Sequence, residues 1–179
     1  MEDLKETFDN LPVYQMKLNP TKCVFAVPAG KLLGFLVSER VIEANPDKIK
    51  AVTSLGKPVN VNQVQRMAGR IAALSRFIRR LGEKAIPLYQ LLRKSDHFVW
   101  TNESNEAFEA LKRQLVNPPV LAAPIEKEPM LLYIAANSKA VSVAVVVERK
   151  EEGKEYPVQR PVYFISEVLT LSKQRYPHW

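Results

Sequence analysis

Two regions of strand-forming sequence lie at opposite ends of the chain, with a long region of helical periodicity between them. The first holds three short apolar or alternating runs, with a hairpin turn expected at residues 28–31, and the second holds three runs rich in β-branched residues. The runs span residues 14–18, 23–27 and 32–38 in the first region, and 130–135, 141–147 and 161–165 in the second. This order predicts an α+β fold with a small antiparallel sheet near the start and a three-stranded sheet near the end.

Proline, asparagine and threonine mark the expected helices. A short amphipathic helix is predicted over residues 1–11, ended by Pro12, and Asn45 before Pro46 predicts a capped helix start. Further helices are predicted over residues 61–80, after Gly82 through Leu92, and after Thr101. Four helices in succession therefore separate the two strand regions.

Positive charge is concentrated in the helical region. The chain has a net charge of +7, and residues 61–100 carry eight Lys or Arg against two Asp or Glu, which leaves +6 in that segment. On a continuous helix over residues 61–80, four arginines would share an arc of roughly 120° opposite the apolar stripe. They are Arg66, Arg70, Arg76 and Arg80. Such a basic edge is typical of a surface that attracts polyanions.

The composition argues against several classes of protein. Cys23 is the only cysteine, so no internal disulfide can form, and His97 and His178 add too few soft ligands for a zinc site. No apolar run reaches the roughly 20 residues of a membrane helix, and the acidic start is unlike a secretion leader. We expect a soluble, intracellular protein without cofactors, and the sequence does not distinguish nucleus from cytoplasm.

Five stretches of the chain, in this order, resemble the reverse transcriptase region of plant long-terminal-repeat retrotransposons of the Ty3/gypsy type. The stretches are LNPTKCVF, KLLGFLVSERVIEANPDKIKAV, PLYQLLRK, FVWTNESNEAFEALKRQL and RPVYFISEVLT. The resemblance covers nearly the whole chain.

The resemblance implies four parts. Residues 1–45 would be a remnant of the polymerase palm, and residues 46–95 the helical thumb. Residues 96–125 would be a connector helix with a proline-rich linker, and residues 126–179 a truncated RNase H-like domain. Within the first part, Leu33, Gly34 and Phe35 resemble the turn that grips the primer. Core packing of a strand is the alternative interpretation of Leu33 and Phe35.

The carboxylates that the family's chemistry needs are not where the resemblance would put them. Polymerases and RNases H hold two metal ions with clustered carboxylates. The four aspartates are scattered, at positions 3, 9, 47 and 96, and the family's polymerase motif would lie upstream of Met1. In the RNase H-like part, the position of the first metal-binding Asp is Ala135, found by counting back from Ser142, and the next carboxylate would fall beyond Trp179. We therefore expect no metal site and no catalysis. The acidic series Glu103, Glu106 and Glu109 is typical of a solvated helix face.

Three hypotheses about function remain. In the first, the thumb binds nucleic acid without sequence preference, through phosphate contacts from Arg66, Arg70, Arg76, Arg80 and Lys84. Phe77 and Tyr89 would then either stack on bases or belong to the core. In the second, the chain is a protein-interaction or self-assembly module that uses an open sheet edge at residues 130–135. In the third, it is a degraded element without a selected role.

Overall fold

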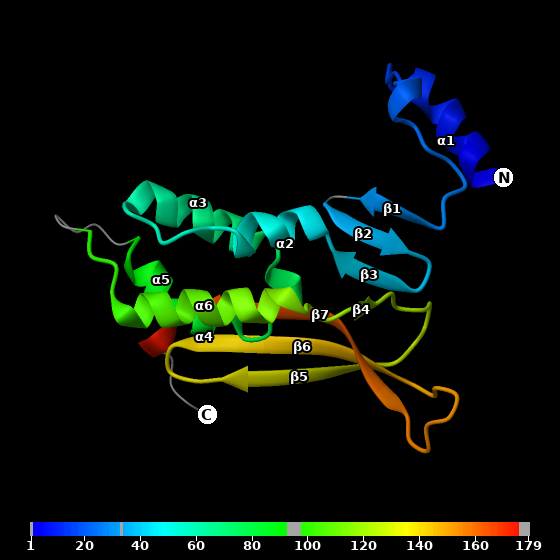
Figure 1. Ribbon diagram of the computed structural model, residues 1–179. Helices are drawn as coiled ribbons and strands as arrows, with labels where there is room; N and C mark the ends of the chain where they lie inside the picture. The colour runs from blue at the N-terminus through cyan, green and yellow to red at the C-terminus, as the bar shows by residue number, and fades with distance from the viewer. Residues whose placement is uncertain (1, 33, 93–97, 176–179) are drawn as a thin grey trace.

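The computed structural model describes residues 2–32, 34–92 and 98–175. Figure 1 shows helices stacked on the longer, C-terminal sheet, the small N-terminal sheet beside them at one end, and the first helix standing apart. This first helix, α1 (Glu2–Val13), buries none of its residues. It runs past the end expected at Leu11, with Pro12 inside its last turn, because the Tyr14 N–H still bonds to the Asn10 carbonyl.

The small sheet contains four antiparallel strands in sequence order. They are β1 (Ala29–Leu32), β2 (Phe35–Ser38), β3 (Val41–Ala44) and β4 (Leu121–Ala122). The strands predicted at residues 14–18 and 23–27 are wrong, because this stretch pairs with no strand in the described part of the chain and is interrupted by the 3₁₀ turn η1 (Pro20–Lys22). The hairpin turn lies at Gly34 rather than at residues 28–31, since Gly34 adopts a φ of +81°. Strand β4 comes from the segment predicted as a linker, and its Leu121 pairs with Ile42.

Three helix starts agree with their cap signals. The Asn45 side chain accepts from the Asp47 N–H at 2.9 Å and begins α2 (Pro46–Thr53). The Asn60 side chain accepts from the Gln63 N–H at 2.9 Å and begins α3 (Val61–Ala72). Thr101 accepts from the Ser104 N–H at 3.1 Å and begins α6 (Asn102–Val116). These caps satisfy N–H groups that the first helical turn cannot bond internally.

The single helix predicted over residues 61–80 is wrong. After α3 ends, the chain continues as the 3₁₀ turn η2 (Ser75–Phe77) and two short helices, α4 (Leu81–Lys84) and α5 (Ile86–Gln90). The break allows Leu74, Phe77 and Ile78 to be fully buried together. Arg80 then reverses the chain with a left-handed φ of +57°. Burial of these apolar side chains outweighs the local preference for a continuous helix.

The three strands predicted in the second half are confirmed, and they are longer than expected. They are β5 (Met130–Ala136), β6 (Ala140–Arg149) and β7 (Val158–Val168), antiparallel in the order β5-β6-β7. A bulge lies at Val145/Val146. The 3₁₀ turn η3 (Lys173–Arg175) follows β7.

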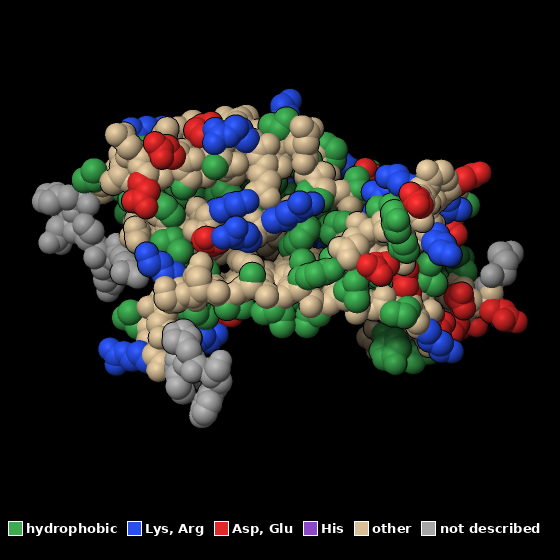
Figure 2. All heavy atoms as spheres, turned by 90° about the horizontal axis from the view of Figure 1, so that it is seen from below, with side chains coloured by type: hydrophobic (Ala, Val, Ile, Leu, Met, Phe, Trp, Pro, Cys, Tyr) green, Lys and Arg blue, Asp and Glu red, His purple; other side chains and the backbone are tan. Residues whose placement is uncertain are grey.

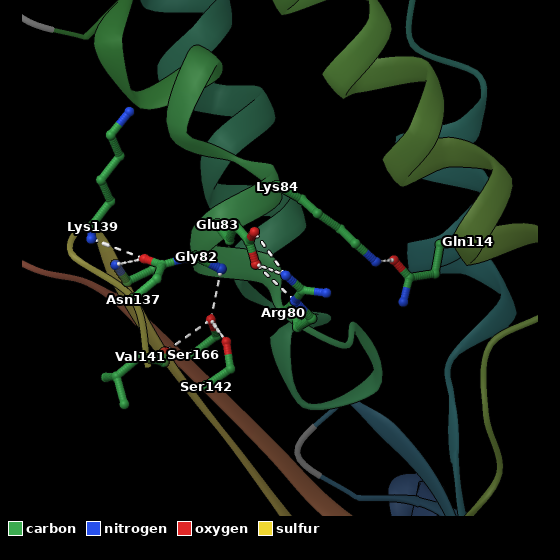
Figure 3. A network of polar contacts seen from close by, with 11 residues as sticks. Arg80, Gly82, Glu83, Lys84, Gln114, Asn137, Lys139, Val141, Ser142 and Ser166 are labelled. Atoms are coloured by element: carbon green, nitrogen blue, oxygen red, sulfur yellow. Dashed lines mark hydrogen bonds and ion pairs between the residues drawn. The ribbon is translucent and has the colours of Figure 1, made fainter. Parts of the chain in front are cut away.

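One core joins the helices to both sheets. It includes Val52, Met67, Phe77, Phe108 and Leu121, with Phe164 contributed by β7. Helix α4 lies against β7, where the Gly82 N–H donates to the Ser166 hydroxyl at 2.9 Å (Figure 3). Within the described residues, no helix has the length and apolar character needed to cross a membrane.

Candidate nucleic-acid interface

The structure separates the five cations that the sequence placed on one basic edge. Arg66 and Arg70 are exposed on α3, whereas Arg76, Arg80 and Lys84 lie beyond the end of that helix. The helix predicted to carry the shared edge ends at Ala72, so these side chains do not follow one another along a single helix.

Arg76 is enclosed between two aromatic rings. Its guanidinium carbon lies 4.8 Å from the ring centroid of Phe35 and 4.5 Å from that of Tyr163. A guanidinium over an aromatic face is attracted by the ring quadrupole. Arg76 thereby connects the β2 strand, the helical region and β7.

Arg80 and Lys84 are also engaged within the protein (Figure 3). The Arg80 Nε donates to Glu83 at 2.7 Å, and the Lys84 Nζ donates to the Gln114 side chain at 2.8 Å. Burial, and then the nearby Arg80 charge, lower the pKa of the Lys84 ammonium. Both groups are therefore poorer candidates for phosphate binding than the arginines of α3.

A basic groove between α2 and α3 brings together cations that are far apart in the sequence. Two adjoining hollows share Arg66 and Arg70, and one extends over the loop with Lys57 while the other extends toward Lys48. The Arg70 Nη1 is anchored by donation to the Ala51 carbonyl at 3.1 Å. We call this set, Lys48, Lys57, Arg66 and Arg70, the α2–α3 groove cations. Sequence reasoning missed both lysines because they lie on a different helix and on a loop, outside the segment of highest charge.

Small residues line the middle of the groove. Ala51, Gly69 and Ala73 lie beside the arginines. A Cβ added at Gly69 would meet no heavy atom within 4 Å, so the helix surface there is open. A backbone without bulky side chains lets a ligand approach the helix closely. The groove can therefore accept an extended anionic chain whose phosphates face the surrounding cations.

The turn at Gly34 and Phe35 lies at one end of this groove. The Lys48 side chain packs directly over Gly34, and its Nζ lies 5.4 Å from the Phe35 ring centroid. Phe35 is half-buried and its ring centroid lies 5.8 Å from that of Phe77, as core packing requires. Leu33, the first member of the predicted primer-grip-like turn, lies outside the described residues.

The two aromatic residues considered for base stacking are not exposed. Phe77 is completely buried, and Tyr89 is half-buried, with burial raising the pKa of its phenol. Their positions agree with the core interpretation. Of the acidic series on α6, Glu109 accepts from Lys112 at 3.1 Å, while Glu103 and Glu106 are exposed.

Residue 135, where the resemblance leads us to expect the family's first RNase H aspartate, lies on an exposed strand. Ala135 is on β5, directly opposite Ser142 on β6. Among residues 2–32, 34–92 and 98–175, no three His, Cys, Asp or Glu side chains gather in a way that could hold a metal ion.

Side chains of both charges are present on the face that Figure 2 shows. Figure 2, seen from below relative to Figure 1, shows Lys and Arg side chains gathered near the middle of that face, with hydrophobic side chains beside them. Acidic side chains lie toward both ends of the same view and also beside the central cations.

Parts of known retroelement proteins are similar to this chain in sequence. Residues 100–179 match the family model described as "RNase H-like domain found in reverse transcriptase". The chain is 28% identical over 158 residues to the Transposon Tf2-3 and Tf2-4 polyproteins of Schizosaccharomyces pombe (strain 972 / ATCC 24843). The alignment covers 88% of this chain and 12% of each polyprotein, so the chain spans about an eighth of the length of these relatives.

Solved structures share the fold. The foamy viral protease-reverse transcriptase in complex with RNA/DNA hybrid aligns with a TM-score of 0.74 and 17% identity, covering 97% of this chain and 23% of that one. The same viral enzyme in complex with dsDNA aligns with a TM-score of 0.67 and 17% identity, covering 88% of this chain and 32% of that one. The predicted fold class is confirmed, as is the resemblance to the RNase H-like part of reverse transcriptase, whereas a plant origin stays a prediction.

Proposed function

We propose that the chain is a non-catalytic module, derived from a reverse transcriptase, that binds nucleic acid in the α2–α3 groove. The observation that carries the proposal is the convergence of the α2–α3 groove cations on an open surface lined by Ala51, Gly69 and Ala73. Cations that line one groove can neutralise phosphates without reading bases, so the binding would be independent of sequence.

Two further observations support the proposal. The foamy viral structures that share the fold are complexes with dsDNA and with RNA/DNA hybrid. The Arg70 guanidinium is held toward the groove by the Ala51 carbonyl, which reduces the side-chain entropy lost on binding a phosphate.

The absence of catalysis is part of the same proposal. It rests on Ala135 at the position where the resemblance would put a metal-binding carboxylate. A hydrolytic site that uses two metal ions needs several carboxylates close together. A chain that binds nucleic acid without this cluster would retain or cover the strand rather than cut it.

A salt series with two matched variants tests the binding site. R66Q/R70Q removes two of the α2–α3 groove cations, and K150Q/K154Q removes two exposed charges from the segment between β6 and β7. Binding of labelled RNA/DNA hybrid, duplex DNA and an unrelated acidic polymer is measured across the series. We expect R66Q/R70Q to weaken binding of both nucleic acids and to flatten the slope of log affinity against log salt by up to about 2.

The control variant separates local contacts from net charge. K150Q/K154Q has the same net charge as R66Q/R70Q and should retain the wild-type slope. Equal losses in the two variants would assign binding to overall charge, and unchanged binding by a folded R66Q/R70Q would overturn the assignment to the groove.

A second candidate function is that of a protein-interaction or self-assembly module. The specific observation in its favour is that every residue of β5 is exposed, although this strand has an apolar sequence.

A further inference from the structure

One of the two hollows of the groove lies between residues 55–58 and α3, and we call it the loop hollow. Its volume is about 320 Å³, at the lower end of the roughly 300–1,000 Å³ that ligand pockets span. Lys57, Arg66 and Arg70 bring three positive charges to it, and Gln63 adds a neutral polar side chain. None of the described residues that line it is Asp or Glu. The loop hollow therefore suits a small anionic group.

The Gln63 side chain is oriented by a backbone group. Its Oε1 accepts from the Val59 N–H at 3.0 Å. Because an N–H can only donate, the amide oxygen must face Val59 and the amino group must point the other way. Within the described part of the chain, no acceptor lies within hydrogen-bond distance of the Gln63 Nε2. Gln63 therefore brings two N–H donors to the lining of the loop hollow.

The loop that carries Lys57 is anchored at its first residue. The Leu55 carbonyl accepts from the Lys112 Nζ of α6 at 2.7 Å. Lys112 is itself held, since its Nζ lies 4.4 Å from the Phe108 ring centroid and donates to Glu109 at 3.1 Å. The Lys112 side chain is 17% exposed, so it supports the loop from the protein side.

The other end of the loop is anchored as well. Pro58 is buried, and the Val59 N–H is bonded to Gln63. Lys57 is exposed between these anchors, and a Cβ added at Gly56 would meet no heavy atom within 4 Å. A ligand can therefore approach the loop backbone closely, and a loop fixed at both ends loses little conformational entropy when it binds.

We propose that the loop hollow is a phosphate subsite of the groove, in which the Gln63 amino group donates to a phosphodiester oxygen alongside Lys57 and Arg66. Glutamine side chains are among the usual donors to phosphate oxygens in protein–DNA complexes. The inference rests on the proposed function and deepens it, because it adds a neutral donor to the α2–α3 groove cations.

A neutral donor leaves a distinct signature in the salt series. Cations that neutralise phosphates release counterions and set the slope of log affinity against log salt. The Gln63 contact releases none, so it contributes to affinity without changing that slope. Its contribution should persist at salt concentrations that weaken the contacts of the cations.

The substitution Q63E tests the donor with little disturbance of the loop. Glutamate keeps an oxygen that can accept from the Val59 N–H, and Gln63 is the third residue of α3, where glutamate favours a helix start. Thermal unfolding should therefore show that Q63E is at least as stable as wild type. Its affinity for labelled duplex DNA should nevertheless fall about tenfold, because an anion replaces a donor to a charged group.

Q90E is the matched control. It makes the same change of charge at an exposed glutamine of α5, which lines a hollow beside the end of β7 and not the groove. Because solvent screens a distant charge, Q90E should bind duplex DNA within about twofold of wild type. Equal losses of affinity in Q63E and Q90E would assign the effect to net charge and overturn the proposal.

Nuclear magnetic resonance gives a direct readout of the contact. The side-chain NH₂ signals of Gln63, identified by their absence in Q63E, should shift when duplex DNA is added. The NH₂ signals of Gln90, identified in the same way, should not. Gln63 signals that stay in place at saturating DNA overturn the proposal.

The variant R66Q/R70Q separates this inference from the proposed function. Wild-type binding by a folded R66Q/R70Q would overturn both, since the groove would not be the binding site. Weakened binding by R66Q/R70Q together with equal binding by Q63E and Q90E would leave the proposed function standing and overturn the phosphate subsite alone.

Discussion

At the scale of single residues, Gly82 lies where α4 packs tightly against the second sheet. An added Cβ would lie 2.8 Å from the Ser166 Oγ and 3.0 Å from the Glu167 carbonyl carbon. Ser166 is held in turn by Ser142 at 2.8 Å (Figure 3). We expect G82A to lower the free energy of unfolding by about 1–3 kcal/mol, as overpacking does, measured by denaturant unfolding. G69A is the control, since its Cβ meets open space within a helix, and it should stabilise by about 0.5–1 kcal/mol. Equal effects of the two substitutions would contradict this account.

Glu128 gives the chain a specific dependence on pH. Hydrogen bonds from Arg149, and then from the Ile125 N–H, lower the pKa of Glu128 from 4.5 to about 2. The depressed pKa stabilises the folded state fully above pH 4.5, and this contribution is lost as pH falls toward 2. E128Q should therefore be less stable than wild type at pH 7, and its stability should change less between pH 4.5 and 2, as thermal unfolding would measure. E103Q, which alters an exposed glutamate, should keep the wild-type profile, and a wild-type profile in E128Q would refute the role of the pair.

At the scale of elements, sequence signals that act within a few residues, such as helix caps and β-branched runs, predict helices and strands correctly. The caps Asn45, Asn60 and Thr101 begin helices in the structure, although only the first and last were identified in advance from sequence. The three strands after residue 130 were also identified, because long β-branched runs suit strands regardless of their partners. The end of α3 at Ala72 was not predicted, because apolar periodicity continues through Ile78 in the sequence. The helix ends there because Leu74, Phe77 and Ile78 pack together in the core. Strand β4 is two residues long and forms only because β3 lies beside it.

The same division between local and distant information applies to the candidate site. Arg66 and Arg70 could be found from local charge, whereas Lys48 and Lys57 join them only when α2 packs beside α3. Sequence spacing alone does not distinguish Arg76 from the other arginines, because its aromatic partners Phe35 and Tyr163 are distant in sequence.

Arg76 gives a prediction about how elements are joined. R76Q removes the cation from between two rings and should lower the free energy of unfolding by about 1–2 kcal/mol. Its nucleic-acid binding should keep the wild-type salt slope, unlike that of R66Q/R70Q. Denaturant unfolding and the binding series are measured on the same preparations, and a reduced slope in R76Q would return this residue to the nucleic-acid surface.

At the scale of the whole molecule, the chain is expected to bind without cutting. We predict no nuclease or polymerase activity in magnesium or manganese, measured on labelled hybrid and on primed template. A135D should remain inactive, because it adds a single carboxylate where two metal ions need several. E103Q/E106Q is a separately purified control. Nuclease activity that differs between preparations and does not follow the substitution would come from a contaminating enzyme. Metal-dependent cleavage that a substitution in this chain abolishes would disprove the prediction.

The pairing of Ile42 with Leu121 constrains the order in which the molecule can assemble. These residues are 79 positions apart, and closing a flexible loop of that length costs about 4 kcal/mol of chain entropy beyond a constant term. The two residues of β4 are too few to meet that cost by themselves, so the helices must shorten the distance first. We infer that the helical core forms early in folding and that the first sheet is completed late, when the chain leaving α6 returns to β3. The helical region is thus joined to that sheet at both of its ends, through β3 before α2 and through β4 after α6. A rotation of the helical region relative to the sheet would therefore have to bend both connections.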